Sequence, residues 1–328
     1  MNKINWGIIG TGKIAHQFAE ALAGTEDAQL YAVASRTAEK ARKFADKFGF
    51  SNAYGSYAEL AENDNIDAVY IATPMSSHYG DAMLCIKNGR NVLCEKSLAL
   101  NLKQTEDILA FAREKNVFFM EAMWMKCRPV FLKVLEWINA GMIGEPRYIK
   151  ADFSNYIPYD KNDRLFRPDC GGGALLDLGV YPLTFADAVF GAPDEVISSA
   201  QLRDGVDVNN SSILRYSDGR CVSADNGFQL QLSNNALVSG TNGFITLGNW
   251  FHCTSEAVLF NSDAKIVEKL VCEPEINGYE YEIREVHRCL RQGMKESPLV
   301  PHDGTVRVMK LMDECRRQWG MTFPEEEK

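Results

Sequence analysis

Residues 4–15 read INWGIIGTGKIA, an apolar run that leads through a Gly-x-Gly-x-x-Ala motif into a segment with helical periodicity. A motif of this kind between a strand and a helix is typical of dinucleotide-binding folds. Gly10 permits the tight turn, Gly12 lets the backbone approach a pyrophosphate, and Ala15 allows close packing of helix on strand. Because the N–H groups at a helix start attract negative charge, we expect a dinucleotide to bind at Gly10, Thr11, Gly12, Lys13 and Ile14. The alternative is an ordinary glycine turn in an α/β unit.

The end of the next predicted strand indicates which dinucleotide binds. Residues 29–34 run into Ser35, Arg36 and Thr37, without an acidic residue. NAD sites place a carboxylate here for the ribose 2′-hydroxyl, whereas NADP sites use an arginine for the 2′-phosphate. Two hydroxyls and a guanidinium suit a phosphate dianion. The sequence therefore predicts NADP(H) in preference to NAD(H), although Arg36 could instead be a solvated charge or stack on adenine.

The first 122 residues alternate strand and helix patterns. Strands are expected at 4–9, 29–34, 67–72, 91–94 and 117–121. This alternation predicts an α/β fold with an N-terminal Rossmann domain, a doubly wound parallel sheet, over residues 1–122. Ligands of such sheets bind beyond the carboxyl ends of the strands.

Residues 123–328 show a different pattern. β-like runs separated by turn signals occupy residues 195–272, and helical patterns cover 174–190, 279–292 and 305–320. The pattern predicts a C-terminal α+β domain with a large, mostly antiparallel open sheet. We expect this domain to bind the substrate. Because an open sheet leaves one face to cover, we expect a homodimer through this sheet.

Composition excludes several classes of partner. The net charge is −9, which argues against nucleic acid and anionic membranes. The longest apolar runs are far shorter than a membrane span, and the N-terminus has no signal-peptide hydrophobic region, so neither a membrane span nor a signal peptide is expected. The nine cysteines include no Cys-x-x-Cys pair, so we expect reduced thiols and a cytoplasmic location. The five histidines lack metal-ligand spacing, so no metal site is expected.

Two segments carry residues suited to proton transfer. Glu95 and Lys96 end a predicted strand on the nicotinamide side of the cleft, where both are expected to contact the cofactor. A lysine there can also bind a substrate oxygen and lower the pKa of a neighbouring acid. Asp177 and Tyr181 are four residues apart on a predicted helix, which puts a carboxylate beside a phenol. Gly179 within that helix costs about 1 kcal/mol relative to alanine, so its missing side chain must be needed. The alternatives are a surface Glu–Lys pair and a structural Asp–Tyr hydrogen bond after a glycine-rich helix start.

Further residues are candidates for ligand contacts. The loop after the third strand, TPMSSH, places Thr73, Pro74, Ser76 and His78 under the cofactor. His78 is expected to contact the dinucleotide or cap the next helix. Aromatic and guanidinium groups suit sugar rings and hydroxyls, and four such residues could line a substrate pocket: Trp124, Arg128, Tyr156 and Arg167. Packing or an inter-domain salt bridge is the alternative for each.

Five motifs together resemble one family. They are GTGKIA at 10–15, ATPMSSH at 72–78, CEKS at 94–97, EAMW at 121–124 and GGGALLDLGVY at 171–181. The chain resembles the Gfo/Idh/MocA oxidoreductases (glucose–fructose oxidoreductase and inositol dehydrogenase), and within them the dimeric dihydrodiol dehydrogenase and NADP-dependent D-xylose dehydrogenase branch. The resemblance implies hydride transfer with sugars, polyols or diols. It also implies Lys96 as the catalytic lysine, Asp177 as the helix aspartate and Tyr181 as the proton-transferring residue.

One position departs from the family pattern. Ser97 follows Lys96 where the family has proline. A cis bond before a residue other than proline costs about 2.5–4 kcal/mol, so we expect a trans bond here. The departure leaves room for a non-catalytic NADP-binding regulator. A glycosidase that uses NAD transiently is a second alternative to the oxidoreductase.

Overall fold

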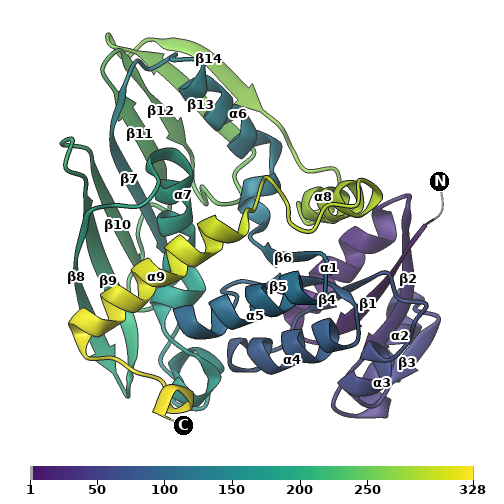
Figure 1. Cartoon of the computed structure of the whole chain (residues 1–328). Coiled ribbons are helices and arrows are strands. Elements are labelled where there is room, and N and C mark those ends of the chain that lie inside the picture. Colours follow the sequence, from purple (N-terminus) through teal and green to yellow (C-terminus); the bar gives the residue numbers. More distant parts are fainter. Residues whose placement is uncertain (1–2, 328) are drawn as a thin grey trace. The chain divides into compact units, whose positions relative to one another are not determined.

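The computed structural model describes residues 3–327, which form two compact units (Figure 1). The first unit comprises Met1–Ala99, Lys103–Cys127 and Pro274–His302, and the second comprises Leu100–Leu102, Arg128–Glu273 and Asp303–Lys328. The sequence placed all of residues 123–328 in one C-terminal domain. Residues 274–302 instead pack with the first unit, so the units interleave along the chain.

The first unit contains a six-stranded sheet in the order β3-β2-β1-β4-β5-β6. All of its strand pairs are parallel. The strands are β1 (Ile4–Ile9), β2 (Ala28–Ala34), β3 (Asn52–Tyr54), β4 (Ala68–Ile71), β5 (Asn91–Glu95) and β6 (Phe119–Ala122). The central strand β4 is buried throughout, as is usual for parallel strands covered on both faces. The strand order reverses between β1 and β4, and this switch point is where doubly wound sheets bind ligands.

Helices connect and cover these strands. They are α1 (Lys13–Gly24), α2 (Ala38–Phe48), α3 (Tyr57–Ala61), α4 (Met75–Lys87), α5 (Leu102–Glu114), the 3-10 turn η1 (Trp124–Cys127) and α8 (Glu280–Arg291). The predicted Rossmann architecture is confirmed.

A series of side-chain hydrogen bonds joins α8 to β1 and to the residue before β2. Trp6 Nε1 donates to His287 Nε2 at 2.8 Å, and His287 Nδ1 lies 2.9 Å from Asp27 Oδ1. An indole N–H can only donate, so His287 Nε2 accepts and Nδ1 carries the proton. This contact joins residues 281 positions apart. Helix α8 also contacts α1 and η1, so residues 274–302 belong to the first unit.

The second unit contains an eight-stranded sheet in the order β14-β13-β12-β11-β7-β10-β9-β8. Its strands are β7 (Pro146–Ser154), β8 (Glu195–Arg203), β9 (Val206–Arg215), β10 (Cys221–Gly227), β11 (Ala236–Gly240), β12 (Gly243–Leu247), β13 (Glu256–Asn261) and β14 (Ile266–Val271). The β7–β10 pair is parallel and the other pairs are antiparallel. The prediction of a mostly antiparallel sheet is confirmed.

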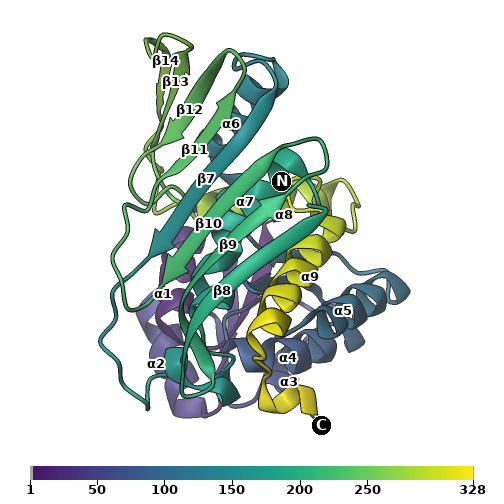
Figure 2. The same ribbon diagram turned by 90° about the vertical axis from the view of Figure 1, so that its left-hand side faces the viewer.

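Helices cover one face of this sheet. Figure 2 shows the sheet from its other, open face. They are α6 (Pro129–Asn139), the π-helix η4 (Leu175–Gly179), α7 (Val180–Phe190) and α9 (His302–Trp319). Helix α7 contacts β7 and β10, and α6 contacts β13. Short 3-10 turns η2 (Arg164–Phe166), η3 (Pro168–Cys170) and η5 (Pro324–Glu327) complete the unit. Along β9, buried Ser212 and Leu214 alternate with exposed Ser211 and Ile213, so the other face is open.

The segment Pro168–Phe190 is long and apolar enough to cross a membrane by length and composition alone. Its most apolar window is 78% buried inside the protein, as expected for a core helix. The expectation that every apolar run is far shorter than a membrane span was therefore wrong for this segment.

The buried histidine predicts a pH-dependent stability. Burial lowers the pKa of His287, opposed by the charge of Asp27. The unfolded chain therefore takes up the proton first, so stability is complete above about pH 7 and falls as the pH drops through about 6.5. We expect urea unfolding between pH 7.5 and 5.5 to show this loss, and His287→Gln, which cannot titrate, to reduce it.

The same experiment has a check on the hydrogen bonds themselves. His287→Ala should lower the free energy of unfolding by about 3 kcal/mol at pH 7.5, because it leaves a cavity and unpaired buried groups. Equal pH slopes for the wild type and His287→Gln would show that His287 does not cause the loss.

Candidate active site

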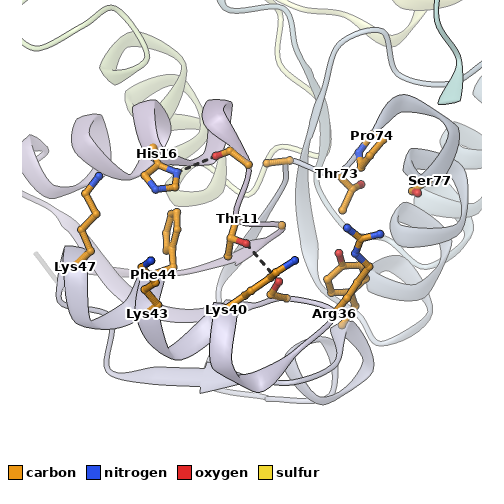
Figure 3. A pocket seen from close by; sticks show the side chains of 15 residues that line it. Thr11, His16, Arg36, Lys40, Lys43, Phe44, Lys47, Thr73, Pro74 and Ser77 are labelled. Carbon is orange, nitrogen blue, oxygen red and sulfur yellow. Dashed lines mark hydrogen bonds between the residues drawn. The ribbon is translucent and has the colours of Figure 1, made fainter. Parts of the chain in front are cut away.

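A cavity of about 760 Å³ lies at the switch point of the parallel sheet (Figure 3). It is bounded by the turn after β1, the end of β2 with helix α2, and the loop after β4. The lining residues are Gly10, Thr11, Gly12, His16, Ser35, Arg36, Lys40, Lys43, Phe44, Lys47, Tyr57, Ala72, Thr73, Pro74 and Ser77. This is the place where a Rossmann sheet binds a dinucleotide.

The two glycines of the turn have different environments. Gly10 has φ of +100°, and a Cβ there would lie 2.7 Å from the carbonyl oxygen of Ala72. Glycine is therefore required at this position by both conformation and space. A Cβ on Gly12 would meet no protein atom within 4 Å. Gly12 faces the cavity and is the N-cap of α1, so its lack of a side chain leaves the first-turn N–H groups open to a ligand.

The end of β2 supplies polar groups to the cavity. Ser35 is buried, with its hydroxyl 3.3 Å from that of Thr11, and Arg36 is exposed at the cavity wall. Thr37 instead caps α2, because its hydroxyl accepts the backbone N–H of Lys40 at 3.4 Å. Of the three residues predicted here, Ser35 and Arg36 line the cavity.

A row of lysines on α2 extends this positive charge. Lys40, Lys43 and Lys47 follow Arg36 at helical spacing, are exposed and line the cavity. Within residues 3–327, Arg36, Lys40 and Lys43 form no salt bridge. In Figure 3 Arg36 lies toward Thr73 and Ser77, whereas Lys47 lies toward His16. These lysines were not predicted from the sequence, although their spacing after Arg36 could have indicated them.

The loop after β4 divides between lining and support. Thr73, Pro74 and Ser77 line the cavity, whereas Ser76 and His78 do not. His78 is buried; its Nε2 lies 3.0 Å from the carbonyl oxygen of Thr73 and its Nδ1 3.0 Å from that of Ser97. His78 therefore joins the loops that follow β4 and β5.

The side chain of Glu95 is hydrogen-bonded to the backbone of Lys96. Its buried carboxylate accepts the hydroxyl of Tyr70 and the backbone N–H of Lys96, the latter at 3.2 Å. Lys96 itself is half-buried. Near Glu95, burial and then the Glu95 charge raise the pKa of Glu282 well above its usual value.

The Lys96–Ser97 peptide bond is cis. The expectation of a trans bond was wrong. The expectation rested on the energy of an isolated peptide bond. In the folded chain Ser97 is fully buried, and its carbonyl oxygen is hydrogen-bonded to His78.

Asp177 and Tyr181 lie on a helix that changes its winding between them. The sequence predicted one helical segment over 174–190, but Leu175–Gly179 is a π-helix and Val180–Phe190 is α-helical. Such wide turns are frequent at functional sites. Tyr181 is buried against Phe153 and His252, with ring centroids 5.5 and 4.7 Å away. Asp177 is half-buried, 3.9 Å from a guanidinium nitrogen of Arg164. The meeting of these residues with Lys96 stays a prediction.

The four residues predicted to line a substrate pocket differ in environment. Trp124 stacks on Tyr279 with centroids 4.6 Å apart, and Arg128 is buried and donates to the carbonyl oxygen of Cys253 at 2.9 Å. Tyr156 is 60% exposed, whereas Arg167 is exposed and paired with Asp169. Their substrate contacts stay predictions.

Comparison with known families agrees with this geometry. Residues 4–123 match the model described as "Oxidoreductase family, NAD-binding Rossmann fold", and residues 131–246 match that of the "GFO/IDH/MocA C-terminal domain". Together with the glycine turn and the cavity at the switch point, these matches define an NAD(P)-dependent oxidoreductase.

Individual relatives extend over the whole chain. Trans-1,2-dihydrobenzene-1,2-diol dehydrogenase of Xenopus tropicalis is 35% identical over 328 residues, covering 97% of this chain and 99% of that protein. The Homo sapiens enzyme of the same name is 33% identical, covering 99% of each. The crystal structure of KijD10, a 3-ketoreductase from Actinomadura kijaniata in complex with NADP and TDP-benzene, matches with a TM-score of 0.86 and 27% identity, covering 96% of this chain and 98% of that one. The chain belongs to the Gfo/Idh/MocA oxidoreductase family, and the predicted resemblance is confirmed.

The two glycines of the turn allow a matched test. Gly12→Ala should leave the free energy of unfolding nearly unchanged, because the new methyl group meets no protein atom. It should weaken dinucleotide binding at least about tenfold by blocking close approach. Gly10→Ala should instead destabilise the fold by about 2 kcal/mol or more, through a disfavoured φ and a clash. Fluorescence titration and urea unfolding separate the two effects. Unchanged dinucleotide affinity in Gly12→Ala would place the pyrophosphate elsewhere.

Proposed function

We propose that this oxidoreductase transfers a hydride between NADP(H) and a carbon bearing a hydroxyl or carbonyl group of a sugar, polyol or vicinal diol. The substrate class is supported by the relatives, which are named for a dihydrobenzene diol and a 3-ketoreductase reaction. The cofactor preference rests on one observation above all: the end of β2 and helix α2 present Arg36 and Lys40 to the cavity with no salt-bridge partner within residues 3–327.

The charges at this wall favour a phosphate over a ribose hydroxyl. An NAD site would need an acceptor for the 2′-hydroxyl, such as a carboxylate. Ser35 and Arg36 follow β2 instead, and Lys40 is one helical turn further on. A guanidinium and an ammonium near one anion give charge-assisted hydrogen bonds, which are stronger than neutral ones. The same charges argue against a glycosidase that works with NAD, and family membership argues against a non-catalytic regulator.

The catalytic proposal assigns a separate role to each of the three predicted residues. When bound, the nicotinamide supplies the hydride donor or acceptor. During oxidation Tyr181 accepts the proton of the substrate hydroxyl, and during reduction it returns that proton. A free tyrosine has a pKa of about 10, so the positive charge of Lys96 is needed to stabilise the phenolate near neutral pH. Asp177 orients the hydroxyl and the ammonium, and Glu95 holds the backbone of Lys96.

We further propose a homodimer formed through the open face of the C-terminal sheet. By strand register Phe244, Phe260, Ile213 and Ile197 share this face. Phe244 and Phe260 stack with centroids 4.6 Å apart, and Ile197 is 50% exposed. An apolar sheet face of this kind suits a twofold, self-complementary contact. Light scattering at micromolar concentration should give a dimer, and a monomer would oppose the proposal.

A reducing compartment such as the cytoplasm fits the thiols. None of the nine cysteines forms a disulfide in the described part of the chain. Burial raises the pKa of several of them, including Cys85 and Cys94. Because disulfides are rare in the cytosol, the state of the cysteines supports our proposal of a cytoplasmic location.

The cofactor proposal has a matched control on the same helix. Arg36→Ala and Lys40→Ala should each weaken NADP binding about 10- to 100-fold, because each removes a charge-assisted contact worth about 1.5–3 kcal/mol. NAD affinity should change little. Arg42→Ala removes an exposed charge of α2 that does not line the cavity, and it should leave both affinities nearly unchanged. Equal losses for NADP and NAD would contradict a 2′-phosphate site.

The catalytic proposal is tested by turnover. Lys96→Met and Tyr181→Phe should each lower kcat by at least about 100-fold, the lower bound for general acid–base catalysis. NADP affinity should remain close to that of the wild type. Absorbance at 340 nm across a panel of sugars, polyols and diols identifies the substrate and measures kcat. Wild-type turnover in both variants would remove these roles.

A further inference from the structure

A buried polar row lies beneath the π-helix of the second unit. Asp207 and Asn210 belong to β9 and Asn226 to β10, and all three are at least 96% buried. Asn210 and Asn226 face each other across the strand pair and exchange two hydrogen bonds of 2.7 and 2.8 Å. Asn210 also donates to Asp207 Oδ2 at 2.7 Å. The row is a continuous network, and buried networks of this kind rigidify what they contact.

The network holds the beginning of the π-helix. Asp207 Oδ2 accepts the backbone N–H of Leu175 at 2.8 Å, one of the N–H groups that a helix start leaves without an internal partner. Gly173, just before the helix, has φ of +121°, and a Cβ there would lie 2.3 Å from Asp207 Oδ1. The glycine-rich turn therefore lies directly against the carboxyl group.

The network also contacts the end of the π-helix. A Cβ on Gly179 would lie 2.7 Å from Asn226 Nδ2. The missing side chain that the sequence indicated at Gly179 is thus explained by the approach of this amide. Asp207 thus binds the start of Leu175–Gly179 and Asn226 lies against its end. This segment carries Asp177 and leads directly into Tyr181.

We infer that Asp207, with Asn210 and Asn226, is a positioning site that fixes the π-helix so that Asp177 and Tyr181 are aimed at the substrate. These three residues act through the helix and do not touch the reacting atoms. The inference rests on the proposed catalytic roles of Asp177 and Tyr181. A displacement of about 1 Å of a catalytic group can lower the rate about 100-fold. Loss of the hydrogen bonds that hold the π-helix should therefore lower kcat.

The chemistry of the network predicts which substitutions are tolerated. Asp207→Asn can keep an oxygen at the Oδ2 position for Leu175 and Asn210, and its amide nitrogen then takes the place of Oδ1, which has no hydrogen-bond partner in the described chain. Asp207→Ala removes the acceptor altogether. Gly179→Ala brings a methyl group against Asn226 from the helix side.

The test measures kcat and its pH profile in variants whose urea unfolding shows that the whole chain, including the second unit, is folded. Asp207→Ala and Gly179→Ala should each lower kcat about 10- to 100-fold. They should also move the pH limb that depends on Tyr181 toward higher pH, with NADP affinity unchanged. Asp207→Asn should retain kcat within about threefold. Ser217→Ala, at an exposed position in the turn after β9, is the control and should leave kcat and its pH profile unchanged.

The outcomes separate this inference from the proposed function. If Tyr181→Phe is impaired while folded Asp207→Ala and Gly179→Ala keep the wild-type kcat and pH profile, the positioning role is wrong and the catalytic role stands. If Tyr181→Phe turns over like the wild type, both are wrong. Should Asp207→Ala fail to fold, Gly179→Ala decides: a wild-type kcat and pH profile overturns the inference, and the expected loss supports it.

Discussion

The close approach of the turn after β1 to the end of β4 is the constraint on which the dinucleotide unit depends. The space beside Gly10 is filled by the carbonyl oxygen of Ala72, so no side chain fits between the two strands at their carboxyl ends. With the strands this close, α1 begins at the sheet edge and its first N–H groups face the cavity. The end of β2 and the loop after β4 then form its walls. The geometry of the cofactor site thus follows from one backbone contact.

Local patterns predicted much of the fold, whereas contacts distant in sequence were missed. Apolar runs separated by amphipathic segments indicated a parallel sheet, and turn signals indicated the antiparallel one. No local pattern shows that Trp6 donates to His287, 281 positions away, so the placement of α8 in the first unit could not be found. The π-helix was missed for a similar reason. The π-helix lies against Asp207 and Asn226 of neighbouring strands, and helical periodicity in the sequence does not reveal such contacts.

The site was predictable where chemistry follows a strand end. Gly10, Gly12, Ser35, Arg36 and Thr73 all line the cavity, since the carboxyl ends of parallel strands meet at one edge. The lysines of α2 were missed because a charged helix face is usually only solvated, and the sequence does not show which way that face points. His78 was placed near the cofactor by its loop, but its ring reaches the carbonyl oxygens of Thr73 and Ser97.

The interleaving of the two units affects how the chain can be divided. The N-terminal 127 residues include every strand of the parallel sheet, yet the unit is completed by Pro274–His302. A fragment ending at residue 127 would expose Trp6 and leave its indole N–H without the His287 acceptor. The polypeptide also enters the second unit more than once, so neither unit is a continuous piece that a protease could release intact by a single cut. Any recombination that exchanges the cofactor unit for that of a relative must therefore carry two separate stretches of gene, one before and one after the segment that encodes the large sheet.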